Sequence, residues 1–142
     1  MSVKQQLSFL RLGGHRLTKT RRAVLAAFDT ARAPISAADL LESLEEVGCS
    51  VHKTTLYREL EFLVDQGLIQ PVHIAASTQH YESTNQPHHH HAVCTDCGQV
   101  NQLHSLELEA KIEQMSQQLA KTGFEVSGHS FEMFGECREC QS

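Results

Sequence analysis

The sequence predicts an α+β protein in two parts, and three observations support this. Apolar residues recur at helical spacing through the first 67 residues, with capping residues before each run and glycines after it. After Gly67, short alternating runs typical of β-strands replace the helical pattern. Two Cys-x-x-Cys pairs then enclose most of the last third of the chain, which indicates a small metal-stabilised domain.

Three helices are expected in the first part. The first follows the capping residue Thr18, the second follows Ser36 and stops at Gly48, and the third begins near residue 53 and stops at Gly67. Each carries an apolar stripe on one side, formed in order by Val24, Leu25 and Phe28, by Leu40, Leu41, Leu44 and Val47, and by Leu56, Leu60, Leu63 and Val64.

Strands are expected from residue 68 onward. Residues 68–74 and 79–83 form a hairpin in which Pro71, which lacks an N–H, confines the first strand to an edge or a bulge. A polar hinge, residues 84–88, separates a first domain (1–83) from a second (89–142). In the second domain, residues 90–94 and 100–103 form another hairpin, a helix runs from residue 106 to Gly123, and residues 124–137 form a final strand.

Charge divides the 142-residue chain in the same way. Residues 1–22 carry six basic side chains and no acid; residues 1–72 carry 9 basic and 8 acidic groups, and residues 73–142 carry 3 and 9. The first part therefore suits phosphate and the second suits cations, although a solvated basic face without a ligand has the same composition. No apolar run is long enough for a membrane span or a signal peptide, so we expect a cytoplasmic protein whose cysteines are thiols or metal ligands.

Helices followed by a hairpin are the outline of a winged helix-turn-helix, a fold that places its third helix in the DNA major groove. That helix begins with polar and basic side chains, among them Thr55, Tyr57 and Arg58, which can bind phosphates or base edges. The alternative is that these side chains only cover an exposed helix.

The two cysteine pairs, Cys94 with Cys97 and Cys137 with Cys140, predict a structural zinc ion. Four thiolates fill a tetrahedral zinc completely and leave no position for catalysis. A pair of redox-active dithiols is the alternative. The fifth cysteine, Cys49, is expected to be a small core residue.

Four consecutive histidines precede the first cysteine pair in "HHHHAVCTDCGQV". Side chains alternate along a strand, so the run can supply two metal sites from its two faces. One would join His89 and His91 to His73 and Glu82 across the hinge; the other would join His88 and His90 to Glu109 and His129. Three imidazoles and one carboxylate suit zinc, whereas iron and manganese usually take more oxygen ligands. Any single histidine here is more often a surface residue than a ligand.

Together these features resemble the Fur family of metal-dependent bacterial repressors over nearly the whole chain. The segments that carry the resemblance are "GHRLTKTRRAVL", "ISAADLLESL", "TTLYRELEFLVDQGLI", "HYES", "HHHHAVCTDCGQV" and "CREC". The resemblance implies a winged-helix domain, a hinge and an α/β dimerisation domain, and hence a homodimer on a palindromic operator in double-stranded DNA. It also implies that Arg16 approaches the minor groove and that Thr55, Tyr57 and Arg58 are the DNA contacts of the third helix. Lys19 is expected to bind DNA beside them.

Two departures from the iron-sensing pattern favour the zinc-sensing, Zur-like branch. Pro34 stands where those members have a histidine, and Gln102 stands where they have a glutamate. The regulatory ion is therefore expected to be Zn²⁺, with Fe²⁺, Mn²⁺ or peroxide sensing as alternatives, and with His80 and His104 as further histidines near the predicted sites. Two other classes compete. A zinc deaminase is disfavoured because no proline precedes Cys94 and four cysteines leave no water position, and a metal buffer would not need the basic N-terminus.

Overall fold

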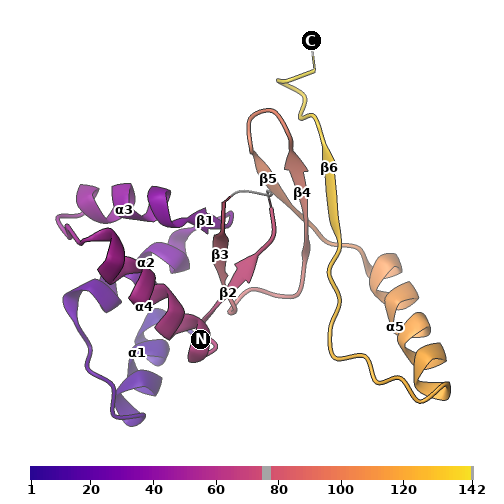
Figure 1. Cartoon of the computed structure of the whole chain (residues 1–142), viewed down its shortest axis with the longest axis horizontal. Coiled ribbons are helices and arrows are strands. Elements are labelled where there is room, and N and C mark those ends of the chain that lie inside the picture. Colours follow the sequence, from indigo (N-terminus) through magenta and orange to yellow (C-terminus); the bar gives the residue numbers. More distant parts are fainter. Residues whose placement is uncertain (75–77, 142) are drawn as a thin grey trace. The chain divides into compact units, whose positions relative to one another are not determined.

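The computed structural model describes residues 1–74 and 78–141, which form two compact units, Met1–Gln86 and Pro87–Ser142 (Figure 1). The boundary between the units falls inside the segment predicted as a hinge. The predicted α+β class is confirmed, since each unit combines helices with a three-stranded sheet. Among the described residues, no helix is long and apolar enough to cross a membrane.

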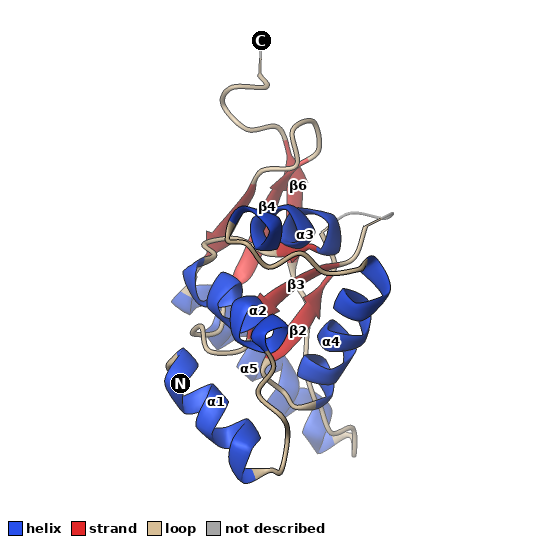
Figure 2. Cartoon of the chain, turned by 90° about the vertical axis from the view of Figure 1, so that its left-hand side faces the viewer, coloured by secondary structure: helices blue, strands red, loops and turns tan. Residues whose placement is uncertain are grey.

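The N-terminal unit packs its helices on a small antiparallel sheet of order β1-β3-β2. Figure 2 shows α2 and α4 in front of the β2–β3 hairpin. Pro71 lies in β2, which is an edge strand of this sheet, as its missing N–H requires. The elements are α1 (Val3–Leu12), α2 (Lys19–Thr30), β1 (Ile35–Ser36), α3 (Ala37–Glu46), α4 (Lys53–Asp65), β2 (Ile69–Val72) and β3 (His80–Ser83).

The predicted caps are present. Thr18 Oγ1 accepts a hydrogen bond from the backbone N–H of Arg21 at 3.1 Å, and Ser36 Oγ accepts one from the N–H of Asp39 at 3.2 Å. The prediction of three helices was wrong in number, because α1 precedes them. Its signal is a capping box, in which the Gln5 N–H donates to Ser2 Oγ and the Ser2 N–H donates to Gln5 Oε1.

One apolar core fills the N-terminal unit. Leu10 of α1, Val24 of α2, and Leu56, Leu60 and Leu63 of α4 have no exposed surface. Burying each such leucine stabilises the fold by about 1.5–3 kcal/mol. Cys49 belongs to this cluster, as its predicted role as a core residue requires. The core holds α4 against α2 and α3 and leaves the opposite face of α4 exposed.

The C-terminal unit contains β4 (His90–Cys94), β5 (Val100–Leu103), α5 (Leu106–Lys121) and β6 (Glu132–Gly135). The strand order is β5-β4-β6, with β5 antiparallel and β6 parallel to the central β4. The predicted final strand over residues 124–137 was too long. Pairing with β4 is limited to residues 132–135, and residues 123–129 instead run alongside α5, with which they line a groove.

Candidate metal centres

The four predicted zinc ligands come together at one end of the C-terminal sheet. Cys94 ends β4, and the parallel pairing of β4 with β6 places it opposite Gly135, two residues before Cys137. The four sulfurs lie within 4.8 Å of one another, and Cys97 Sγ is 3.8 Å from Cys137 Sγ. Sulfurs around a tetrahedral zinc are also about 3.8 Å apart, since each Zn–S bond is about 2.3 Å. The residues present therefore fit a four-thiolate zinc site.

Backbone N–H groups already favour a thiolate in this cluster. The N–H groups of Cys97 and Cys137 lower the pKa of Cys94 to about 6, and the Cys137 N–H donates to Cys94 Sγ at 3.3 Å. Hydrogen bonding with the side chains of Cys137 and Cys94 raises the pKa of Cys140 to about 12. Without a cation the cluster thus shares protons unequally, and a divalent ion that replaces those protons allows all four sulfurs to act as thiolates.

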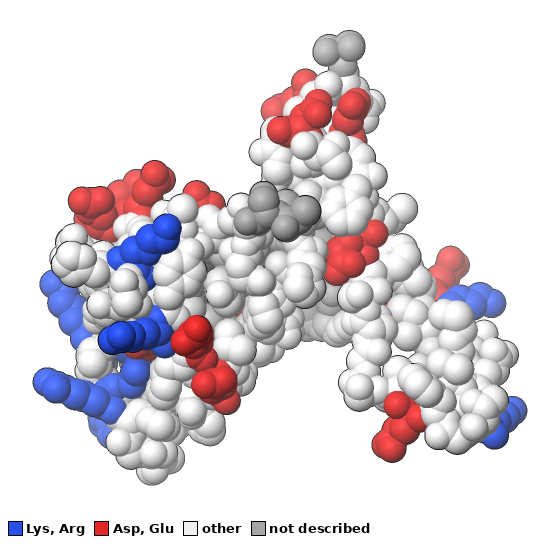
Figure 3. All heavy atoms as spheres, in the orientation of Figure 1, with Lys and Arg blue, Asp and Glu red and all other residues white. Residues whose placement is uncertain are grey.

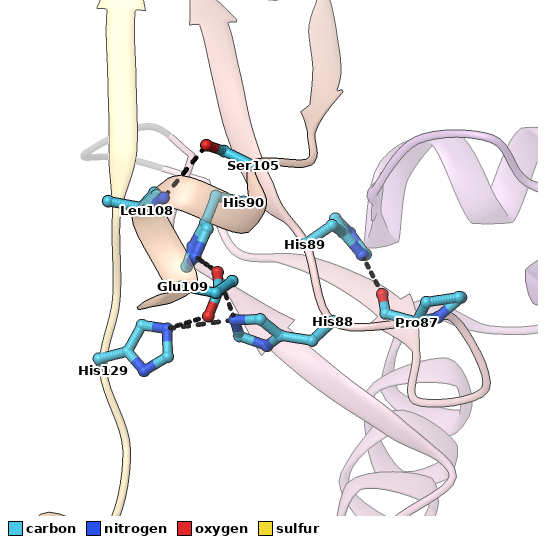
Figure 4. Close-up of polar contacts among 8 residues, drawn as sticks. All are labelled: Pro87, His88, His89, His90, Ser105, Leu108, Glu109 and His129. Atoms are coloured by element: carbon cyan, nitrogen blue, oxygen red, sulfur yellow. Dashed lines mark hydrogen bonds and ion pairs between the residues drawn. The ribbon is translucent and has the colours of Figure 1, made fainter. Parts of the chain in front are cut away.

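The second cluster lies in the same unit and joins three elements (Figure 4). The Glu109 carboxylate of α5 lies between His90 of β4, His88 just before it, and His129 on the segment that leads to β6. His90 Nε2 is 2.7 Å and His88 Nε2 3.4 Å from Glu109 Oε1, and His129 Nε2 is 3.8 Å from Glu109 Oε2. Ligand atoms around a tetrahedral zinc with nitrogen and oxygen ligands are about 3.3 Å apart. These four side chains can therefore take one ion with little rearrangement.

The electrostatics of Glu109 agree with that geometry. Partial desolvation raises the pKa of Glu109, but the hydrogen bond with His90 and the charges of His88, His90 and His129 outweigh it, so the net shift is downward. An ionised carboxylate among three imidazoles is a strong cation ligand set. His90 is nearly fully buried, which fixes the ring in the cluster.

The other two histidines of the run form a separate pair. The rings of His89 and His91 stand 4.8 Å apart at 85°, and His89 Nδ1 contacts the Pro87 carbonyl oxygen at 2.8 Å. A neutral imidazole that donates from Nδ1 keeps its lone pair on Nε2, the usual arrangement of a ligand histidine. The alternation along the run thus gives two pairs of histidines, each with its own surroundings.

The two remaining residues of the predicted hinge site belong to the N-terminal unit. Glu82 lies in β3 and its Oε1 accepts a hydrogen bond from Nε2 of its cross-strand partner Gln70 at 2.9 Å. His73 follows β2 and is exposed. Their grouping with His89 and His91 joins residues of different units and stays a prediction from the sequence.

The residues predicted to contact DNA lie on the helical face of the N-terminal unit. Thr55, Tyr57 and Arg58 are exposed in the first turns of α4, and Lys53 Nζ lies 5.9 Å from the centre of the Tyr57 ring. Arg16 is exposed in the loop before α2; Lys19 is exposed at the start of α2, where its Nζ donates to the Gly48 carbonyl at 3.3 Å. Figure 3 shows Lys and Arg side chains gathered on the helices of this unit.

One of the six N-terminal cations has a structural role. Arg21 Nε donates to Glu59 Oε1 at 2.6 Å, and the guanidinium stacks on the Phe62 ring at 3.9 Å. This pair ties α2 to α4, so Arg21 is occupied within the fold and the basic surface is smaller than the sequence count suggests. No local pattern signals the pair, because its members are 38 positions apart.

Three known proteins illustrate what the chain is similar to. A family model described as "Ferric uptake regulator family" matches residues 13–134. A ferric uptake regulation protein of Neisseria meningitidis serogroup B is 31% identical over 143 residues, covering 100% of this chain and 97% of that protein. The peroxide operon regulator of Bacillus subtilis is 29% identical over 138 residues, covering 97% and 92%. The solved structure of the Helicobacter pylori ferric uptake regulator superposes with a TM-score of 0.84 at 23% identity, covering 99% and 93%.

Proposed function

Because the chain belongs to the Ferric uptake regulator family, we propose that it is a zinc-responsive repressor that controls zinc-uptake genes in the cytoplasm. Members of this family are metal-responsive transcriptional regulators that bind operator DNA as dimers, so the chain is a DNA-binding regulator and not an enzyme. The choice of zinc is the part of the proposal that goes beyond the family.

The nitrogen-rich ligand set of Glu109 and its three histidines carries that choice. Zinc accepts three imidazoles and one carboxylate in a tetrahedral site. Iron(II) and manganese(II) prefer more oxygen ligands in a larger coordination shell. The cluster offers a single carboxylate, and its closest approach is the 2.7 Å contact with buried His90. Such a ligand set favours zinc over iron(II) and manganese(II).

The predicted hinge site supports the same ion on sequence grounds. We propose that Glu82 and His73 of the N-terminal unit bind an ion together with His89 and His91 of the C-terminal unit. Glu82, His89 and His91 stand at positions that match ligand positions of the family, which supports this proposal, while Gln102 and Pro34 stand where iron-sensing members have a glutamate and a histidine. The loss of these two ligands disfavours a six-coordinate iron site.

The mechanism is allosteric. A regulatory ion that binds the DNA-competent arrangement better than other arrangements shifts the population toward it, by about 1–3 kcal/mol of coupling. The four-cysteine zinc would cross-link the end of β4 to the C-terminus and keep the dimerisation unit folded. In a two-fold dimer, each α4 then reads one half of a palindromic operator through Thr55, Tyr57 and Arg58.

The test is a selection of DNA fragments by the labile metal. Protein stripped of labile ions, with its four-cysteine zinc retained, is mixed with sheared genomic DNA in the presence of chelator, zinc, iron(II) or manganese(II). We expect zinc alone to enrich one palindrome, and the binding to weaken steeply with salt because phosphate contacts release counterions. Enrichment only with iron(II) or manganese(II) would contradict the choice of zinc, and no enrichment under any condition would indicate a metal buffer.

Iron or peroxide sensing is the second candidate. Two of the similar proteins are named for ferric uptake and for the peroxide operon, and the likeness to both is of comparable strength. Manganese sensing has weaker support. The iron(II) arm of the selection, repeated after brief peroxide exposure, separates these candidates: peroxide sensing predicts that DNA binding is lost after exposure, and iron sensing predicts that it persists.

A further inference from the structure

We propose that His104 is a fourth imidazole ligand of the ion that we assign to His73, Glu82, His89 and His91, in place of the carboxylate absent at position 102. This inference rests on the proposed function and adds a residue that determines metal specificity. The observations that support it come from the C-terminal unit alone, because His89, His91 and His104 all lie in it.

Strand register brings the three histidines together. In the β4–β5 pair, His91 stands opposite Gln102 and His90 opposite Leu103. One further step along the antiparallel register places His89 opposite His104. Since side chains alternate between faces, His89, His91, Gln102 and His104 share one face of the hairpin, and His88 and His90 point to the Glu109 side. The face opposite the Glu109 cluster thus carries three imidazoles and one amide.

Ring positions fit a shared ion. The centre of the His89 ring is 4.8 Å from that of His91 and 5.8 Å from that of His104. Two imidazoles on one tetrahedral zinc have ring centres about 5 Å apart, given Zn–N bonds of about 2.0–2.1 Å. His104 is exposed just after β5, so its ring can turn toward His89 without disturbing a core.

Hydrogen bonds orient two of the rings. His89 Nδ1 contacts the Pro87 carbonyl oxygen at 2.8 Å, and His104 Nε2 lies 3.3 Å from Gln102 Oε1. When a neutral ring donates to an oxygen through one nitrogen, it binds a cation through the other, so the proposed ligand atoms are His89 Nε2 and His104 Nδ1. Gln102 then positions His104 through this hydrogen bond. A glutamate at position 102 would instead bind the ion directly.

With His104 as a ligand, the site of His89 and His91 becomes richer in nitrogen. Replacing a carboxylate by an imidazole removes one negative charge and one oxygen, which disfavours iron(II) and manganese(II) and favours zinc. His104 would therefore supply an imidazole on the face where Gln102 offers no carboxylate.

The experiment measures zinc affinity and cobalt(II) spectra in the full chain. All variants are made in a His129→Ala background, which weakens ion binding by the Glu109 cluster so that the measured affinity is that of the site with His89 and His91. Absence of thiolate-to-cobalt absorption checks that the four-cysteine site keeps its zinc. In this background, His104→Ala should lower zinc affinity by about 10-fold or more and change the cobalt(II) ligand-field bands. Gln102→Ala should keep the bands with a smaller loss of affinity, and His52→Ala, an exposed histidine of the other unit, should change neither.

Unchanged affinity and unchanged cobalt bands in His104→Ala would overturn the inference. A loss of affinity with unchanged bands would also overturn it, because that result assigns His104 a positioning role. His104→Gln, with a thermal melt, checks that the effect does not come from the fold. The proposed function fails separately: it is lost if the unmodified chain shows no zinc-dependent DNA binding, whatever His104 does to the affinity.

Discussion

The two units of the molecule are stabilised in different ways. The N-terminal unit holds a cluster of thirteen buried residues, five of which have no exposed surface. In the described part of the C-terminal unit the buried apolar side chains are Val93 and Cys94, the buried polar ones are His90 and His91, and α5 has no buried residue. Apolar burial folds the first unit, whereas the second depends on strand pairing and on its ligand clusters. We therefore expect metal binding and folding to be linked in the C-terminal unit and independent in the N-terminal unit.

The apolar residues of the C-terminal unit are largely at the surface. Met115 and Leu119 of α5 are 54% and 42% exposed, and Phe134 of β6 is 61% exposed. Exposed apolar surface of this kind is typical of an interface. The family's regulators are dimers, and we expect the partner subunit to cover this apolar surface.

Breaking the four-cysteine cluster should have the largest effect. Cys97→Ser leaves three thiolates and should release the zinc. The C-terminal unit should then unfold or become monomeric, while the helices of the N-terminal unit persist. The binding free energy of structural zinc is about 10–16 kcal/mol in zinc-finger peptides. Zinc content, sedimentation and limited proteolysis measure this. The matched control, Cys49→Ala in the apolar core, should keep its zinc. A zinc-loaded, dimeric Cys97→Ser protein would contradict the contrast between the units.

Truncating the apolar core should have the next largest effect, in the other unit. Leu60→Ala removes a side chain with no exposed surface and should lower the free energy of unfolding by about 2–5 kcal/mol without changing zinc content. Urea denaturation followed by circular dichroism measures this. Val47→Ala, at a position 72% exposed in the same unit, should change stability by about 0.5 kcal/mol at most. Equal losses in the two variants would mean that the core is not the main support.

Removing the proposed hinge carboxylate should affect regulation and not folding. Glu82→Gln should weaken zinc-dependent operator binding by about 5- to 150-fold, the range of typical allosteric coupling, and should leave the dimer intact. Anisotropy of labelled operator with and without zinc measures this, with the exposed Glu42→Gln as control. If Glu82→Gln and Cys97→Ser behaved alike, the division into regulatory and structural sites would be wrong.

A change on α4 should affect DNA binding by an amount similar to that of Glu82→Gln, and should affect DNA binding alone. Arg58→Ala should cost about 1–3 kcal/mol of operator affinity and leave zinc binding unchanged, because Arg58 is exposed and outside every ligand cluster described. Lys121→Ala, an exposed basic residue of α5, is the control and should bind the operator normally. Equal weakening by the two variants would indicate a general charge effect.

Local signals make much of the fold predictable. Thr18 and Ser36 mark the starts of their helices by side-chain caps, and Pro71 marks an edge strand by its missing donor. The helix at residues 3–12 has an equally local signal in Ser2 and Gln5, which the apolar periodicity alone does not reveal. The predicted last strand is too long because alternating residues at 124–131 look like a strand, although only pairing with β4 decides where β6 begins.

The site is predictable in part for a similar reason. Alternation along the histidine run is a local property, and it is enough to separate His88 and His90 from His89 and His91. The closeness of His104 to His89 cannot be deduced in the same way, because it requires the register of two strands. The pairing of Arg21 with Glu59 also depends on how α2 packs against α4, and no local pattern encodes that.

Whether histidine-rich labile sites make DNA binding zinc-dependent can be decided by one titration. Operator binding is followed by anisotropy while free zinc, iron(II) or manganese(II) is raised in metal buffers, and native mass spectrometry counts the ions on each dimer at every point. We expect one zinc per chain to be present before the operator binds, and binding to appear as further zinc fills the labile sites. Operator binding that follows iron(II) or manganese(II) loading, or that is complete with the four-cysteine zinc alone, would contradict this mechanism.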